Sequence, residues 1–181
     1  MNSLQVNIRE STDDDNLAMS SIYSQLLALG TGSLADAPPS DEEIGRCKED
    51  AAESGCPCFV AEVQGAIVGF AYAEKFSWEK GYRYTVKDYV YVHPEAQGEG
   101  VATQLLEALI AECEARGFRQ MVNFVCDAKN EAAVNLHKKV GFKEIGRMKS
   151  IGFKFDEWLD TIVMQRPLGA GDAAKPNLEK K

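Results

Sequence analysis

The stretch between Asp88 and Thr103 has the residue types and spacing of an anion-binding turn. It reads DYVYVHPEAQGEGVAT, so an apolar strand leads into a glycine-bearing turn that opens an amphipathic helix. Gly98 and Gly100 let the backbone approach a ligand closely, because they carry no Cβ. The first N–H groups of a helix are unpaired and aligned with the helix dipole, so they attract anions. The turn therefore predicts a site for a phosphate or pyrophosphate group.

Two other phosphate-binding motifs fail to match this turn. A P-loop would need a Gly-Lys-Ser/Thr ending, and a dinucleotide fingerprint would need a glycine where Thr103 stands. The remaining alternative is a glycine turn that only connects a strand to a helix.

The cysteines and histidines do not form a metal motif. The chain has five cysteines, an odd count, and two histidines. The spacing of Cys56 and Cys58 is too tight for the usual two-residue metal knuckle, and the motif has no second half. We therefore expect reduced thiols and no metal.

The elements that must position the turn follow from hydrophobic periodicity and turn residues. Gln64-Gly65 predicts a tight hairpin, and Ser40 predicts a helix N-cap. The strand–helix–strand order after residue 83 implies a parallel strand pair, so the predicted fold is α/β (α+β) with a mixed sheet. We expect strands at about 5–9, 57–63, 66–73, 83–92, 119–126, 142–148 and 158–165, and helices at about 15–29, 41–54, 99–116 and 130–140.

Composition and charge indicate one globular domain. The chain has 181 residues, 45% of them hydrophobic, and a net charge of −8, which gives nucleic-acid binding no electrostatic support. We assign the domain to residues 1–167 and expect residues 168–181 to form a flexible tail with almost nothing to bury. No apolar run reaches the roughly 18 residues of a membrane span, and the N-terminus lacks a signal-peptide pattern, so we expect a cytoplasmic protein with no membrane partner.

The turn and a second motif together resemble the GNAT superfamily of acetyl-CoA-dependent N-acetyltransferases. Gln97-x-x-Gly100-x-Ala102 follows an apolar strand, and Asn130 opens a helix that ends LHKKVGF. The resemblance implies a splayed mixed sheet flanked by helices, with acetyl-CoA as co-substrate. It implies that the strand serves the pantetheine arm, that the turn serves the pyrophosphate, and that the cofactor-binding residues are Val90, Tyr91, Val92, Gln97, Gly98, Glu99, Gly100, Val101, Ala102, Thr103 and Asn130.

The likeness is greatest to the phosphinothricin and methionine sulfoximine acetyltransferase group. It spans about residues 5–167 and rests on these further segments: Ile8-Arg9, Phe59–Val63, Gly69–Ala73, Tyr82–Val86 and His137. It implies transfer of an acetyl group to the amine of a small amino-acid-like acceptor by direct attack, and a homodimer. By the same resemblance, the backbone N–H of Val90 or Tyr91 is placed to donate to the oxyanion.

Three hypotheses remain for the general base, because this chain has Lys87 where close relatives carry a glutamate. In the first, Glu74 at the end of the neighbouring strand takes the role, since Asp88 should point to the opposite face from Lys87. In the second, Lys87 itself is the base, which would require burial to depress its pKa. In the third, positioning alone suffices, or the protein binds acyl-CoA without catalysis.

The remaining candidates each have a structural alternative. His137 stands where relatives commonly place a tyrosine near the thiolate, so it is a candidate general acid or a packed histidine. Arg83, expected on the same strand face as Lys87, suits an α-carboxylate or a surface ion pair. Trp78 and Tyr84 are candidates for acceptor binding, although aromatic residues more often simply pack.

The acceptor class is also open to an alternative. The net charge of −8 would steer cationic acceptors such as polyamines, aminoglycosides or a protein N-terminus toward the protein. Arg83 facing the cleft would disfavour such cations.

Overall fold

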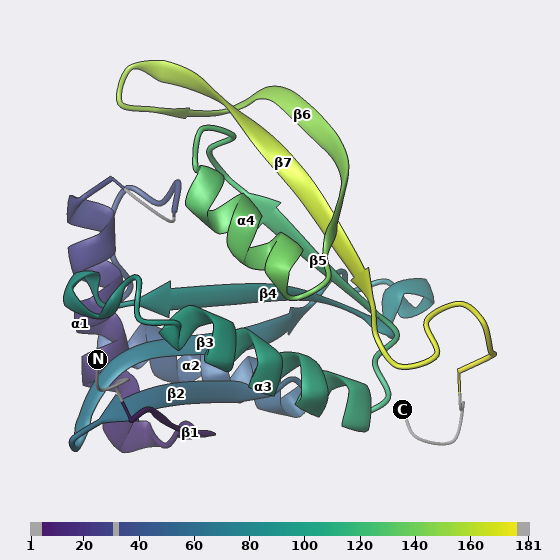
Figure 1. Cartoon of the computed structure of the whole chain (residues 1–181), viewed down its shortest axis with the longest axis horizontal. Helices are drawn as coiled ribbons and strands as arrows, with labels where there is room; N and C mark the ends of the chain where they lie inside the picture. Colours follow the sequence, from purple (N-terminus) through teal and green to yellow (C-terminus); the bar gives the residue numbers. More distant parts are fainter. Residues whose placement is uncertain (1–4, 31–32, 177–181) are drawn as a thin grey trace.

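The computed structural model describes residues 5–30 and 33–176, which form a mixed seven-stranded sheet with helices on both faces (Figure 1). The strand order is β1-β2-β3-β4-β5-β7-β6, and the β4–β5 pair is parallel. The strands are β1 (Asn7–Glu10), β2 (Cys58–Val63), β3 (Ala66–Lys75), β4 (Thr85–Val92), β5 (Gln120–Val125), β6 (Lys143–Lys154) and β7 (Glu157–Pro167). The helices are α1 (Asn16–Ala28), α2 (Asp41–Glu53), α3 (Val101–Ala115) and α4 (Glu131–Lys139), with short 3₁₀ turns η1 (Asp13–Asp15), η2 (Lys80–Tyr82) and η3 (Pro94–Ala96).

Two apolar clusters hold the helices to the sheet. On one face, α3 buries Leu105, Leu106 and Leu109, together with side chains from β3, β4 and β5. On the other face, α1 and α2 pack against alternate residues of the same strands, including Phe70 and Tyr91. Figure 1 shows α3 in front of β2 and β3, with α2 behind them. The mixed sheet flanked by helices confirms the predicted fold class.

Local sequence signals fix several of these elements. The Ser40 hydroxyl accepts from the backbone N–H of Glu43, and the Glu43 carboxylate accepts from the N–H of Ser40, which makes a reciprocal cap at the start of α2. Gln64 and Gly65 both have positive φ, 51° and 84°, as the predicted tight hairpin between β2 and β3 requires.

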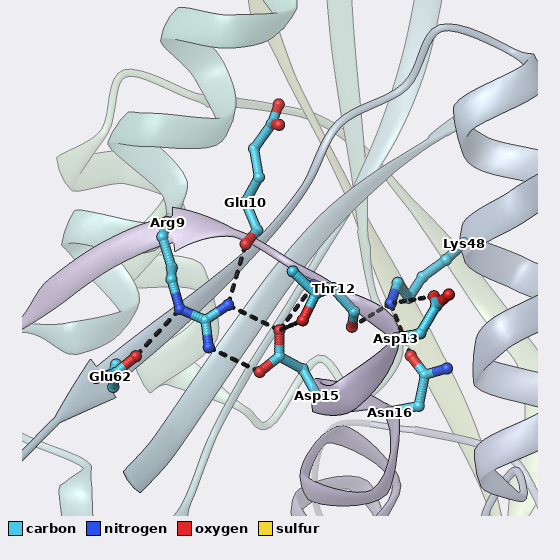
Figure 2. Close-up of polar contacts among 8 residues, drawn as sticks. All are labelled: Arg9, Glu10, Thr12, Asp13, Asp15, Asn16, Lys48 and Glu62. Atoms are coloured by element: carbon cyan, nitrogen blue, oxygen red, sulfur yellow. Dashed lines mark hydrogen bonds and ion pairs between the residues drawn. The ribbon is translucent and has the colours of Figure 1, made fainter. Parts of the chain in front are cut away.

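An ion-pair network ties the first strand to the helices behind the sheet (Figure 2). The Arg9 guanidinium donates to both carboxylate oxygens of Asp15 at 2.8 Å and to Glu62 at 3.1 Å. The backbone N–H of Thr12 donates to the same Asp15 carboxylate at 2.7 Å. Lys48 on α2 donates to the Thr12 carbonyl oxygen at 2.6 Å, so η1 is bound from both sides.

Three sequence expectations were wrong in detail. The strand predicted at 142–148 continues to Lys154, because β6 and β7 meet in a turn where Phe155 and Asp156 both have positive φ. The strand predicted from residue 83 begins at Thr85, so Arg83 lies in a turn and shares no strand face with Lys87. The segment after Pro167 begins with a fully buried side chain, that of Leu168.

The end of the described chain contacts the start of β5. The Arg119 side chain donates to the carbonyl oxygens of Gly171 and Ala174. Residues 177–181 of the predicted tail lie outside the described residues. Within residues 5–30 and 33–176, no helix has the length and apolar character needed to cross a bilayer.

Candidate active site

The predicted anion-binding turn is formed as a left-handed entry into α3. Gly98 and Gly100 have φ of 83° and 80°, a region that disfavours every residue with a side chain. Gly100 is the N-cap of α3, and no side chain caps the helix there. Space is open above both glycines, since an added Cβ would meet nothing within 4 Å at either position. The first N–H groups of α3 are therefore free of a side-chain cap and open to a ligand.

Neighbouring side chains hold the turn and contribute positive charge. The Gln97 amide donates to the carbonyl oxygen of Val92 at 3.2 Å, which fastens the turn to the end of β4. The Lys139 ammonium, from the last turn of α4, lies 3.5 Å from the Thr103 hydroxyl in the first turn of α3. An ammonium beside a helix N-terminus adds to the attraction for a phosphate. These residues fit the pyrophosphate of coenzyme A.

Strand β4 leads to this turn with a free edge. Its parallel pairing with β5 covers Thr85, Val86 and Lys87 and goes no further, whereas its pairing with β3 continues to Val92. The two strands start together and then diverge, as Figure 1 shows. This divergence confirms the predicted splay of the sheet.

Beyond Lys87 the diverging strands β4 and β5 leave a gap between their backbones. The alternation of β4 decides which of its backbone groups face this gap. The N–H of His93 donates to the Val68 carbonyl oxygen, so odd-numbered residues of β4 face β3. The carbonyl oxygens of Asp88 and Val92 accept from Asn123 and Gln97, which places even-numbered residues on the β5 side. Val90, and not Tyr91, therefore presents its N–H and C=O toward the gap. This is the arrangement needed to hold an extended amide-containing arm beside the strand.

The two charged candidates for base chemistry form one ion pair. Glu74 and Lys87 are direct partners across β3 and β4, and the Lys87 ammonium donates to the Glu74 carboxylate at 2.8 Å. The Glu74 side chain is 48% exposed and that of Lys87 is 22% exposed. Burial by itself would lower the pKa of Lys87, but the hydrogen bond to Glu74 and the Glu74 charge leave it raised. A raised pKa is the opposite of what a lysine base requires.

Aromatic side chains continue the same sheet face from this ion pair. Tyr72 and Tyr89 stack with ring centroids 4.7 Å apart, and the Lys87 ammonium lies 5.9 Å from the centroid of Tyr89. Tyr72 also lines a cavity of about 630 Å³ between the helices α1 and α2 and the strands β2 and β3. Burial, then the charges of Asp50 and Glu74, raise the pKa of the Cys47 thiol in the cavity wall. By strand alternation Glu74 lies on the same face of β3 as Phe70 and Tyr72, so the cavity and the ion pair share one face of the sheet.

His137 lies on the other face of the sheet with both ring nitrogens engaged. Its Nε2 is 2.9 Å from Asp88 Oδ2, and its Nδ1 is 2.8 Å from the Ala133 carbonyl oxygen. The side chain is buried, and Phe142 packs edge-on against the ring at 5.1 Å. Asp88 points away from Lys87, as strand alternation predicts.

The three acceptor candidates differ in exposure and in the contacts they make. Trp78 is 90% exposed. Arg83 donates to the carbonyl oxygen of Lys80 and stacks over the Tyr84 ring at 4.7 Å. The Tyr84 carbonyl accepts from the N–H groups of residues 119 and 120 at the start of β5. Acceptor binding by these three residues stays a prediction.

Asn130 caps the helix that carries His137. Its side-chain oxygen accepts from the Ala133 N–H at 3.0 Å, which orders the first turn of α4. A contact between Asn130 and the cofactor arm stays a prediction.

Comparison with known proteins identifies the family. Residues 22–142 match the model of the acetyltransferase (GNAT) family. The chain belongs to the GNAT acetyltransferase family. A phosphinothricin N-acetyltransferase of Alcaligenes faecalis is 43% identical over 170 residues, 93% of this chain and 86% of that protein. A methionine sulfoximine/methionine sulfone acetyltransferase of Salmonella typhimurium is 39% identical over 114 residues, 63% of this chain and 66% of that protein.

Solved GNAT structures agree with the fold along nearly the whole chain. The phosphinothricin acetyltransferase of Sinorhizobium meliloti, in complex with acetyl-CoA, superimposes with a TM-score of 0.92 and 36% identity, covering 97% of this chain and 95% of that one. An acetyltransferase of Salmonella typhimurium, solved with acetyl-CoA, gives a TM-score of 0.89 and 31% identity, covering 96% and 98%.

Sequence reasoning found the GNAT turn but missed the partners of His137. Asp88 and Asn123 are buried polar residues that meet His137 from β4 and β5. One signal for Asp88 is present in the sequence, because it alternates with Val86 and Val90 on a strand face that is otherwise apolar. A carboxylate on a buried face requires a polar partner.

Proposed function

We propose that this GNAT protein is an acetyl-CoA-dependent N-acetyltransferase for the amino group of a small amino-acid-like acceptor of the phosphinothricin and methionine sulfoximine type. The observation that carries the proposal is the free edge of β4, which leads directly into the uncapped start of α3. The 43% identity to a phosphinothricin N-acetyltransferase over 93% of the chain supports the acceptor class.

In this proposal, different groups of the chain bind the cofactor and the acceptor amine. The glycine turn and the first N–H groups of α3 bind the pyrophosphate of acetyl-CoA, which supplies an activated acetyl thioester. The Val90 backbone pairs with the extended arm, and its N–H is the group on this edge that is placed to donate to a developing oxyanion. The reacting amine arrives from the opposite face, where Glu74 and Lys87 lie.

Glu74 is the proposed proton acceptor for the incoming ammonium. Its carboxylate accepts a hydrogen bond from Lys87 and remains about half exposed, so it can still accept a proton from an amine directly or through water. Lys87 then acts as a cation that holds this carboxylate in place. The cavity beside Tyr72 and Cys47 receives the acceptor side chain, supported by its volume of about 630 Å³.

We propose a homodimer formed through the β6–β7 hairpin. Its exposed apolar side chains support this assignment, since Phe153, Phe155 and Trp158 are each more than half exposed. Light scattering on the intact protein should give twice the chain mass of 19.9 kDa. A Phe153→Ser, Trp158→Ser double variant should shift the protein toward monomer, and a wild-type monomer would contradict the dimer.

The deciding experiment is turnover of acetyl-CoA against an acceptor panel. Phosphinothricin, methionine sulfoximine, methionine sulfone, natural amino acids, spermidine and a short peptide are each incubated with the protein. Free coenzyme A and acetylated acceptor are quantified by chromatography, because the exposed Cys47 would react with thiol reagents. Turnover on an amino-acid analogue supports the proposal. Cofactor binding without turnover on any amine would favour an acyl-CoA-binding protein instead.

A further inference from the structure

The chain segment before α2, residues 33–39, forms one wall of the cavity beside Tyr72, and we name it the wall segment. Four of its residues line that cavity: Ala35, Ala37, Pro38 and Pro39. Residues 33–39 form no helix or strand of their own, so they have no regular backbone hydrogen bonds to fix them. The position of the wall therefore depends on contacts with the elements around it.

The tip of the β6–β7 hairpin contacts the wall segment through Lys154. The Lys154 ammonium donates to the carbonyl oxygen of Ser33 at 2.9 Å and to that of Ala35 at 3.0 Å. It also lies 5.1 Å from the centroid of the Phe155 ring, and the residue is half-buried. Hydrogen bonds from a charged donor are stronger than those between neutral groups. One side chain thus joins two carbonyl oxygens of the wall segment to the hairpin.

Close packing surrounds this hydrogen-bonded junction. The buried Gly152 of β6 lies against the wall segment, since a Cβ added there would be 2.6 Å from Leu34 Cδ1. The Phe155 ring covers Gly30 at the end of α1 in the same way, with 2.9 Å to an added Cβ. The hairpin tip and the wall segment are therefore in direct contact on both sides of the lysine.

Helix α1 supplies further contacts to the wall segment. The hydroxyl oxygens of Tyr23 and Ser33 share a hydrogen bond of 2.6 Å, and the Ser33 hydroxyl oxygen accepts from the N–H of Ala35 at 3.1 Å. The Ser20 hydroxyl donates to the carbonyl oxygen of Pro39 at 2.7 Å. These bonds join neutral groups, whereas the hairpin provides a charged donor.

We propose that Lys154 is a positioning residue that fixes the wall segment beside the cavity and thereby sets the affinity for the acceptor side chain. The inference rests on the proposed function, in which this cavity receives that side chain. Without the ammonium, two carbonyl oxygens lose their shared donor and the wall is in place in fewer molecules. The apparent affinity for the acceptor then falls in proportion to that fraction. The glycine turn and the free edge of β4 share no residue with the wall segment, so acetyl-CoA binding is unaffected.

The first test is the kinetic effect of Lys154→Met, which removes the ammonium and keeps an unbranched side chain. KM for phosphinothricin or methionine sulfoximine should rise about fivefold or more, whereas kcat and KM for acetyl-CoA should stay within about twofold. A purely structural defect would reduce the amount of folded enzyme and hence the apparent kcat, without changing the acceptor KM alone. An acceptor KM equal to that of the wild type would overturn the proposal.

Two further variants isolate the role of the lysine. Lys149→Met removes the same charge from an exposed position of β6 and should leave all three constants unchanged. Leu34→Ala removes the packing against Gly152 without touching Lys154, and it should also raise the acceptor KM. An equal rise in the Lys149→Met enzyme would assign the effect to net charge and overturn the proposal.

The oligomeric state must be followed in parallel, because the proposed dimer uses the same hairpin. Light scattering should give the wild-type mass for Lys154→Met. A rise in acceptor KM that accompanies only a change in mass would assign the effect to assembly and overturn the role of Lys154 within one chain.

Motion of the wall segment gives a readout that does not depend on turnover. Backbone ¹⁵N order parameters of Leu34 and Ala35 should be about 0.85 in the wild type and fall below about 0.6 in Lys154→Met, the values of rigid and flexible backbone. Unchanged order parameters in Lys154→Met would overturn the positioning role.

The outcomes separate this inference from the proposed function. A mobile wall segment with an unchanged acceptor KM would overturn the link between the wall and acceptor binding. Absence of turnover by the wild type on every acceptor would contradict the transferase itself, whereas the order parameters would still report whether Lys154 fixes the wall segment.

Discussion

Glu74 and Lys87 are cross-strand partners on β3 and β4, and their pairing places a carboxylate next to the strand position of Lys87. The family resemblance implies a glutamate at the strand position of Lys87, and Glu74 is the direct cross-strand partner of that position. Glu74 therefore supplies a carboxylate from β3 in the same part of the sheet. Lys87 opposite it holds the carboxylate in place through a 2.8 Å charge-assisted hydrogen bond.

Removing the Glu74 carboxylate tests whether it accepts the amine proton. Glu74→Gln should lower kcat/KM by about 100-fold at pH 7, because the amide cannot take a proton from an ammonium. The loss should shrink as pH rises, since more acceptor is then already the free amine. Initial rates from pH 6 to pH 10 measure the profile.

The matched control is Glu79→Gln, an exposed residue on the loop between β3 and β4. It removes the same charge and should leave the profile unchanged. A Glu74→Gln enzyme that loses activity equally at every pH would assign Glu74 a structural role in holding Lys87, and not that of a base.

At the level of elements, the start of α3 can be tested without changing the rest of the helix. Gly100→Glu places a carboxylate at the uncapped N-terminus, where the phosphates are expected to bind, and forces a side chain into a φ of 80°. Affinity for acetyl-CoA should fall by at least about 100-fold, or about 2.7 kcal/mol. Calorimetric titration measures the affinity, and circular dichroism checks that the fold is kept.

Gly117→Glu provides the control for that substitution. Gly117 follows the other end of α3 with φ of 84°, and an added Cβ there also meets nothing within 4 Å. The backbone strain is therefore of the same kind, but no anion site is expected at a helix C-terminus. Equal affinities of the two variants for acetyl-CoA would contradict the assignment of the turn.

Elements whose signals are local could be predicted from the sequence. Ser40 with Glu43, Gln64 with Gly65, and the glycine turn before α3 each depend on neighbouring residues. The length of β6 could not be predicted, because its turn uses a phenylalanine and an aspartate at positive φ where glycine or asparagine would be the usual signal. Arg83 was misplaced because the strand begins two residues later than its apolar pattern indicates.

The candidate site also contains one part that local sequence signals predict and one part that they do not. The turn residues are adjacent in the sequence, so their geometry followed from spacing alone. Asp88 and His137 are 49 residues apart and meet because α4 packs over the place where β4 and β5 part. No local pattern encodes that meeting, although a carboxylate on an apolar strand face indicates that some partner must exist.

In the whole molecule, polar contacts add to the links that the two apolar clusters make between elements. Lys154 of β6 donates to the carbonyl oxygens of Ser33 and Ala35, so the hairpin is tied to the segment between α1 and α2. The network of Arg9 and Asp15 joins β1 and β2 to the start of α1 (Figure 2). The Lys154 bonds and the Arg9–Glu62 pair each span more than 50 residues of the sequence, and the Arg9–Asp15 pair fastens the start of α1 to that network, so their loss should destabilise the fold as a whole.

Acid should weaken the Asp15 link and thereby the whole fold. The hydrogen bonds from Arg9 lower the pKa of Asp15 from 3.8 to about 2, so its contribution is complete above about pH 4 and is lost as pH falls toward 2. Asp15→Asn should reduce the free energy of unfolding by about 2 kcal/mol at pH 7, and the difference from wild type should vanish near pH 2. Urea unfolding across this range measures it. The exposed Asp14→Asn should stay within about 0.5 kcal/mol of wild type, and a pH-independent Asp15→Asn deficit would exclude the ion pair as its cause.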